Sequence, residues 1–333
     1  MVLGGLQMGI VNNLSTLIIV RLMPGSTLLG ISIYQTGLIG SSVIISKLTQ
    51  HIINPLRIKP SIVHNFDQKE MKLYDSSVYK HITDYMYFFV IFWVTFQLVY
   101  KSIMPIIKPS NFHYTSSYRN IETEASNIRK SNKFWLIWFV LFLISSIAGF
   151  YTMNISNIGF LIQDKADMEI VNFVAGVALC LGPLLCGVSS DKVEFKSMLM
   201  MNICCLGFGS FLFCMTCHIG TFWFYLLLVV IYLNIGACCF IFSSCCIMMY
   251  GPEIGKRLQP IFLLIWVVFG VVNFEIDSNI RMGCELKHFG LWSLGVFCVT
   301  ALIVNYKLDF KTNKSDKQNT SLVIRIIMRL RGV

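Results

Sequence analysis

The stretch Gly187-Val-Ser-Ser-Asp191-Lys192-Val-Glu-Phe-Lys196 is a short charged link between two long apolar segments. Residues 170–186 before it and residues 197–217 after it contain no Asp, Glu, Lys or Arg. A link of this length joins two antiparallel helices, and an apolar helix of about 20 residues crosses the ~30 Å hydrocarbon layer of a bilayer. The stretch therefore predicts a helical hairpin inside a membrane.

The composition of the whole chain extends this prediction. The 333 residues are 55% hydrophobic and 13% charged, with a mean hydropathy of +0.67, whereas soluble domains carry about 25% charge. Inside lipid every backbone amide must be paired internally, which leaves helices or a closed barrel. The apolar runs are long and unbroken rather than ten-residue alternations, so helices are favoured. We predict an all-α, polytopic membrane helix bundle.

Reading the apolar runs in order predicts about nine transmembrane helices. The domains that follow are a partial N-terminal half at 1–107 with a polar loop at 50–82, a linker at 108–133, a six-helix C-terminal half at 134–306 and a basic tail at 307–333. The tail is amphipathic at 322–331 and lies on the membrane surface or is disordered. The nine expected spans are 1–20, 26–45, 85–104, 134–153, 170–186, 197–217, 222–249, 260–274 and 289–304.

The distribution of Lys and Arg predicts the orientation. Placing Arg21, the stretch Lys101–Lys133, the 187–196 link, Lys256 and Arg257, and the tail on one side puts 18 of the 27 basic residues there. The richer side is expected to be cytoplasmic, although five basic residues between Arg57 and Lys80 oppose this. The first span lacks the positively charged segment that begins a signal peptide, so it is predicted to be an internal membrane helix. The protein is thus expected to be a multi-pass integral membrane protein.

The net charge of +10 does not indicate a nucleic-acid partner. The basic residues sit in loops and in the tail, where anionic lipid headgroups are the expected partners, and zinc-finger spacing and clustered loop aromatics are absent. The expected partners are the lipid bilayer and a small organic solute.

Neither a cofactor nor an enzyme activity is predicted. Most of the 12 cysteines lie inside apolar runs, where Cys behaves as a small buried hydrophobe, and they lack metal-ligand spacing. The six histidines are scattered over loops and span ends, and nucleophile-elbow, zincin and P-loop motifs are missing. A membrane-embedded enzyme is the disfavoured alternative.

The charged link resembles the inter-helix loop of the major facilitator superfamily, G-x-x-x-D-(R/K)-x-G-(R/K)-(R/K). Gly187, Asp191, Lys192 and Lys196 match this pattern, whereas Glu194 and Phe195 depart from it. The resemblance implies a gating loop that links conformational states. The alternative is an ordinary polar turn in which Asp191 caps the next helix.

The first two spans are similar to the fourth and fifth helices of the oxalate/formate antiporter and monocarboxylate-porter-like branch of that superfamily. The matching features are Gly5 and Gly9, the turn Arg21-Leu-Met-Pro-Gly25, and Gly30, Gly37 and Gly40. Small residues let helix backbones approach and slide, and they also occur in any tightly packed membrane bundle. Further matches are Phe134-Trp-Leu-Ile-Trp138, Tyr250-Gly-Pro252 and Gln259–Gly270.

This resemblance assigns the nine spans to helices four to twelve of a twelve-helix carrier. A complete carrier rocks two six-helix halves about a midplane site, so the first three helices of the N-terminal half are missing. We expect an incomplete product; a remnant, or helices supplied from elsewhere, are the alternatives.

The function implied is transport of a small organic solute by alternating access, with a monocarboxylate-like anion as the leading substrate. In the antiporter branch the eighth and eleventh helices supply basic residues, but 170–186 and 260–274 contain none. A monoanion, a proton-coupled acid and a neutral solute therefore stay open. The alternative function is a transporter-derived binding or regulatory module without transport activity.

Polar side chains inside the spans are candidates for lining the cavity, because amides both donate to and accept from a solute. Asn154 and Asn157 share one helix face. The alternative for each residue is hydrogen bonding between helices of the bundle. The candidates are Gln7, Asn12, Gln35, Asn154, Asn157 and Asn234.

Overall fold

The structure is a computed structural model. It describes residues 14–20, 22–23, 26–53, 62–66, 69–73, 80–103, 118–162, 168–190, 192–215, 221–279 and 282–306. The chain forms two compact units, the first from Met1–Ile39 with Phe112–Val333 and the second from Gly40–Asn111. The expected division into a partial half, a linker, a complete half and a tail stays a prediction.

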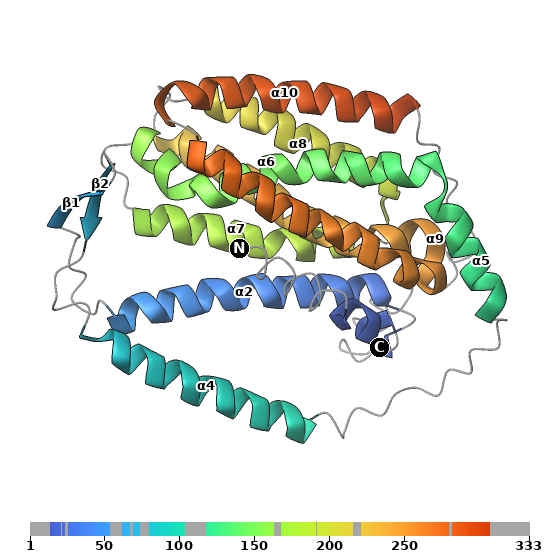
Figure 1. The fold of residues 1–333 in the computed structure, drawn as a ribbon, viewed down its shortest axis with the longest axis horizontal. Helices are drawn as coiled ribbons and strands as arrows, with labels where there is room; N and C mark the ends of the chain where they lie inside the picture. Colours follow the sequence, from blue (N-terminus) through green and yellow to red (C-terminus); the bar gives the residue numbers. More distant parts are fainter. Residues whose placement is uncertain are drawn as a thin grey trace, which may run out of the picture. The chain divides into compact units, whose positions relative to one another are not determined.

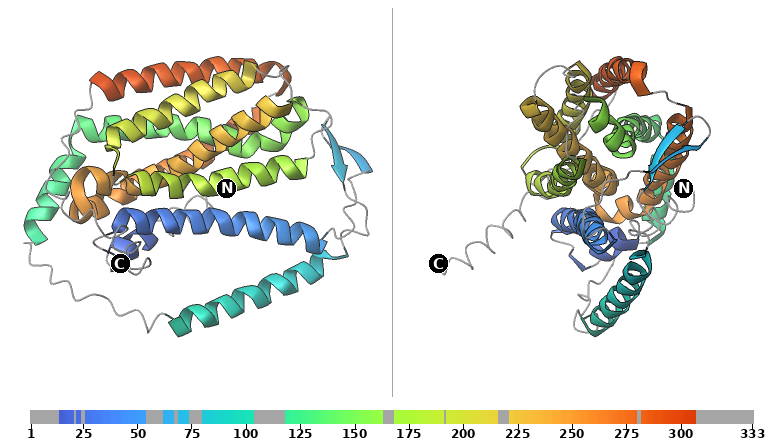
Figure 2. Two further views of the ribbon diagram at one scale, coloured as in Figure 1. Left: turned by 180° about the vertical axis from the view of Figure 1, so that it is seen from behind. Right: turned by 90° about the vertical axis from the view of Figure 1, so that its left-hand side faces the viewer.

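The first unit is dominated by long apolar helices that follow one another along the chain (Figures 1 and 2). Five described helices are long and apolar enough to cross a membrane, and their best segments include Asn132–Thr152, Ile170–Ser189 and Phe222–Phe262. The chain is therefore a multi-pass integral membrane protein. The helices of this unit after the linker are α6 (Asn132–Ile162), α7 (Met168–Ser189), α8 (Phe195–Met215), α9 (Thr221–Asn279) and α10 (Met282–Tyr306).

Helix α9 consists of two antiparallel arms, 221–250 and 252–279, which meet at Gly251. Gly251 has φ 79° and ψ 166°, a combination that is essentially restricted to glycine. The side-chain amide of Gln259 in the second arm donates to the carbonyl of Phe242 in the first at 2.8 Å. The expected spans 222–249 and 260–274 lie in the two arms, and the chain reverses within the expected Tyr250-Gly-Pro252 turn.

The charged link is shorter than the sequence indicates. Helix α7 continues to Ser189 and α8 begins at Phe195, so the turn is confined to residues 190–194. Gly187 therefore lies in the last turn of α7 and Lys196 in the first turn of α8. At this link the expected span 170–186 ends too early and the expected span 197–217 begins too late, because charged and small residues were assigned to the turn.

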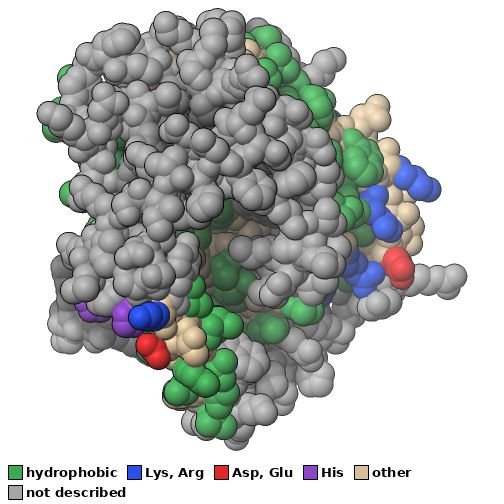
Figure 3. Space-filling view, turned by 60° about the vertical axis from the view of Figure 1, so that its left-hand side comes forward, with side chains coloured by type: hydrophobic (Ala, Val, Ile, Leu, Met, Phe, Trp, Pro, Cys, Tyr) green, Lys and Arg blue, Asp and Glu red, His purple; other side chains and the backbone are tan. Residues whose placement is uncertain are grey.

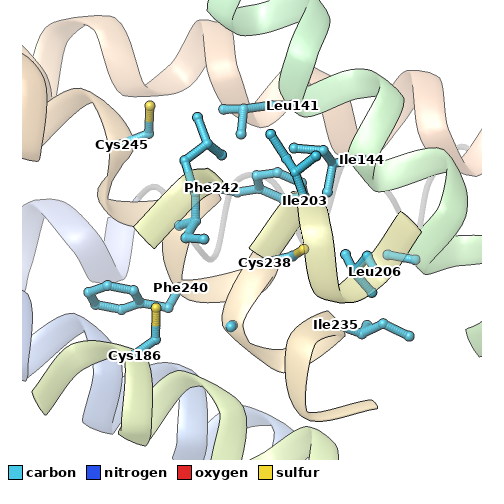
Figure 4. Close-up of a cluster of buried hydrophobic side chains, with 14 of the residues drawn as sticks. Leu141, Ile144, Cys186, Ile203, Leu206, Ile235, Cys238, Phe240, Phe242 and Cys245 are labelled. Carbon is cyan, nitrogen blue, oxygen red and sulfur yellow. The ribbon is translucent and has the colours of Figure 1, made fainter. Parts of the chain in front are cut away.

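Four helix pairs carry most of the packing in this unit. α7 packs on the first arm of α9, α8 packs on both α10 and α9, and α6 packs on α9. Phe134 of α6 contacts Phe262 of the second arm edge-on, with ring centroids 5.1 Å apart. Figure 4 shows part of the resulting core, with Leu141, Ile203 and Phe242 facing one another and Phe240 beside Cys186.

A short helix precedes this bundle. Helix α5 (Tyr118–Arg129) lies inside the segment that was expected to be a linker, and it contacts α6 and α9. Its buried Ala125 and half-buried Ile128 face the bundle. The spacing of Ile121, Ala125 and Ile128 is that of an amphipathic helix, and it is the signal by which the sequence could have revealed α5.

The second unit contains the end of α2 (Thr27–Ile53), a hairpin and α4 (Ile82–Ile103). The hairpin pairs β1 (Ile62–Phe66) with β2 (Lys69–Leu73) in antiparallel register, with Ile62 opposite Leu73. It lies in the stretch that was expected to be a polar loop, and the all-α prediction omits it. Aromatic side chains of α4, among them Phe88 and Phe92, line a shallow apolar groove with Ile45 and Leu48.

Candidate functional site

A polar seam forms where the first part of α2 meets α7 and α9. Its members are Ser32, Tyr34, Gln35 and Thr36 of α2, Cys180 and Gly187 of α7, and Ser243 of α9. All of them belong to the first unit. These side chains sit among helices that are otherwise apolar, so their hydrogen bonds decide whether α2 stays attached.

The strongest contact in the seam joins Gln35 to Ser243. The side-chain amide nitrogen of Gln35 donates to the hydroxyl of Ser243 at 2.6 Å, and the two residues are 2% and 1% exposed. A buried amide must be paired because leaving it without a partner costs about 1–3 kcal/mol. The bond therefore fixes α2 against the first arm of α9.

Helix α7 supplies the second side of the seam. The thiol of Cys180 donates to the carbonyl of Thr36 at 3.4 Å. Gly187 faces Ser32 so closely that a Cβ atom on Gly187 would overlap the Ser32 side chain. Gly187 is thus needed for the approach of α2 and α7, a role in packing that the loop-based prediction did not include.

Two hydroxyls in the seam lack a protein partner. The Tyr34 hydroxyl and the Thr36 Oγ1 are buried and make no hydrogen bond to the described part of the chain. A hydroxyl in this state is unfavourable in an apolar environment. Both groups can donate to and accept from a polar molecule, which makes them the chemically active part of the seam.

The predicted candidates are only partly brought together. Gln35 lies in the seam, whereas the side-chain amide of Asn234 donates to the Val230 carbonyl within its own helix. The side-chain amide of Asn202 in α8 donates to the Asn234 carbonyl at 2.9 Å and accepts from the Cys238 thiol at 3.0 Å. This network ties α8 to the first arm of α9.

The remaining candidates are less fully described. Gln7, Asn12 and Asp191 lie outside the described residues. Asn154 and Asn157 lie in α6, three residues apart, but the structure does not describe their side chains. The roles predicted for these five residues therefore stay predictions.

The basic residues of the charged link occupy different surroundings. Lys192 is exposed in the turn, and Lys196 is half-buried in the first turn of α8. Within the described residues the seam itself contains no charged side chain. Any solute held there would be bound by hydroxyls and amides.

Sequence reasoning missed Tyr34, Thr36 and Ser243. Hydroxyl residues are ordinary in membrane helices because they bond to their own backbone, as Ser244 does to Phe240. The signal that could have found them is the run Ser32 to Thr36, in which three of the five residues carry hydroxyls and one an amide side chain. The chain matches no protein-family model and no curated protein.

Proposed function

We propose that the chain carries a small organic solute across a membrane by alternating access, as a carrier of the major facilitator type. The observation that carries the proposal is the polar seam, in which the buried hydroxyls of Tyr34 and Thr36 make no hydrogen bond to any residue that the structure describes. A polar group without a hydrogen-bond partner is costly in an apolar environment, and a polar solute would offset that cost.

The contacts among the six helices after the linker support this type of carrier. With the arms of α9 counted as the fourth and fifth helices, Trp138 on the first helix donates to the Ile261 carbonyl on the fifth at 3.1 Å. Gly182 on the second meets Gly236 on the fourth, and Gly207 on the third meets Phe297 on the sixth.

These contacts have an internal symmetry. Let the first, second and third helices correspond to the fourth, fifth and sixth. The contact of the first helix with the fifth then corresponds to that of the fourth with the second, and the contact of the third with the sixth corresponds to itself. In the same way, the contact of the third helix (α8) with the fourth (the first arm of α9) corresponds to a contact of the sixth helix (α10) with the first (α6). Both of these contacts occur. Two three-helix units of inverted topology form the halves of major facilitator carriers.

The seam also suggests the chemistry of the solute. Hydroxyl donors bind carboxylate oxygens as well as neutral polar groups, so a monocarboxylate-like anion is the substrate to test first. Proton coupling is compatible with such a substrate, because a protonated carboxylic acid would find both donors and acceptors in the seam.

Uptake of a labelled short-chain monocarboxylate into proteoliposomes tests the proposal. We expect saturable uptake. We expect the double variant Tyr34→Phe with Thr36→Val to raise KM about 10-fold, since each substitution removes a hydrogen bond to the solute. The matched control is Ser145→Ala, which removes a hydroxyl that bonds to Phe142 in its own helix. Absence of saturable uptake of any small organic acid or neutral polar solute would overturn the proposal.

A further inference from the structure

The junction of α5 and α6 places three basic residues around an exposed tryptophan. Arg129 ends α5, Lys130 and Lys133 flank the turn, and all three are exposed. The indole Nε1 of Trp135 donates to the Arg129 carbonyl at 2.9 Å, and Trp135 is 49% exposed. The hydrogen bond holds the ring beside the basic residues.

The helix that follows shows where this junction sits relative to lipid. Phe134 and Ile137 are buried in the bundle, whereas Trp135 and Phe139, one turn apart, are 49% and 44% exposed. Because Asn132–Thr152 of α6 is long and apolar enough to cross a membrane, its exposed aromatic face is suited to contact with lipid. Trp residues at such a position sit at the level of the lipid headgroups.

The nearby carboxylates do not neutralise the junction. Glu122 lies two turns before Arg129 and is 4.0 Å from Arg257, and Glu253 pairs with Lys256 at 2.6 Å. Glu124 is exposed on α5, but it is about 140° around the helix from Arg129 at 3.6 residues per turn. The three cations therefore face solvent and the membrane surface with no ion pair among the described contacts.

We propose that the α5–α6 junction is a binding site for the headgroup of an anionic phospholipid. The Arg129 guanidinium would hold the phosphate through paired N–H donors, and Lys130 and Lys133 would add positive charge at the surface. Trp135 would pack against the glycerol backbone and the first methylenes. Figure 3 shows Lys and Arg side chains, with an acidic side chain among them, beside hydrophobic side chains at the right-hand edge of the view.

The alternative is general attraction between the basic end of the bundle and any anionic surface. Two matched double variants separate the two ideas. Arg129→Gln with Lys133→Gln removes two charges from the junction, and Lys192→Gln with Lys196→Gln removes two charges from the α7–α8 link. A lipid held at the junction is sensitive to the first pair only.

Native mass spectrometry of the purified chain, titrated with phosphatidylglycerol or phosphatidylcholine, measures the retained lipid. We expect selective retention of phosphatidylglycerol, with roughly 30-fold weaker affinity in the junction variant, about fivefold for each of the two charges removed, and little change in the link variant. Equal losses in the two variants, or equal retention of the two lipids, would overturn the proposal. Thermal unfolding of both variants verifies that the fold is retained.

Two further experiments identify the ligand. Quenching of tryptophan fluorescence by brominated phosphatidylglycerol should decrease in Trp135→Phe, because the quenched ring is at the site. Inorganic phosphate at millimolar concentration should not displace the lipid; displacement would mean that the junction binds a free anion, which contradicts a lipid site.

Discussion

Single residues decide how α2 attaches to the bundle. Gln35 is predicted to line a cavity, and its side-chain amide bonds to Ser243 across the seam. The amide could be predicted to need a partner, because no amide side chain is buried in an apolar segment without one. Its partner could not be predicted, because Ser243 lies 208 positions away and only the tertiary structure brings the two together.

The Gln35–Ser243 bond should be measurable as a coupling energy. In a double-mutant cycle of Gln35→Ala and Ser243→Ala, we expect a coupling of about 0.6–1.7 kcal/mol, the range of interhelical hydrogen bonds in membranes. Unfolding of the purified protein in increasing denaturing detergent measures it. A cycle that pairs Gln35→Ala with Ser145→Ala should give no coupling, and equal couplings would contradict a specific bond.

Gly187 should tolerate no side chain while Ser32 is present. We expect Gly187→Ala to destabilise the attachment of α2 because the added Cβ overlaps Ser32. Ser32→Gly should restore stability in the same background, measured as the midpoint of thermal unfolding. Gly37→Ala, where a Cβ meets nothing within 4 Å, is the matched control and should have little effect. Failure of the rescue would show that Gly187 is required for another reason.

At the scale of elements, long apolar spans were predictable and short polar elements were not. Both arms of α9 follow from unbroken apolar runs, and Pro252 and Gly251 indicated the turn between them. The α5 helix and the β1–β2 hairpin escaped prediction because each is short and partly polar. Their formation depends on tertiary contacts rather than on a strong local preference.

The reversal in α9 depends on one backbone conformation. We expect Gly251→Ala to destabilise the fold by about 1–3 kcal/mol, because φ 79° with ψ 166° is unfavourable for any residue with a Cβ. Beyond the adjoining backbone, that Cβ would meet none of the described residues within 4 Å, so the expected effect comes from backbone strain. Gly295→Ala, at a helical position with equally open space, should be neutral or slightly stabilising.

At the scale of the whole molecule, the sequence predicted a membrane protein and a preferred orientation. Composition was sufficient to predict a membrane protein, because helices with apolar segments of this length must be surrounded by lipid. The pairing of helices was not predictable from the runs, because it depends on small residues such as Gly182 and Gly236 meeting between helices that are distant in sequence.

The orientation is open to a direct measurement. We expect an epitope tag in the α7–α8 link, next to Lys192, to be inaccessible to antibody in intact cells and accessible after permeabilisation. A tag between Phe66 and Lys69, in the hairpin turn, should be accessible without permeabilisation. The reverse pattern would place the basic end on the outside and contradict the predicted topology.

The crossing of α7 with the first arm of α9 limits how this protein can move. Gly182 and Gly236 each face main-chain atoms of the other helix, and Pro183 also faces Gly236. Where backbone touches backbone there is no side chain that could rotate aside to absorb a displacement. We therefore expect these two helices to move together, in which case access to the hydroxyls of Tyr34 and Thr36 would require α2 to move away from them.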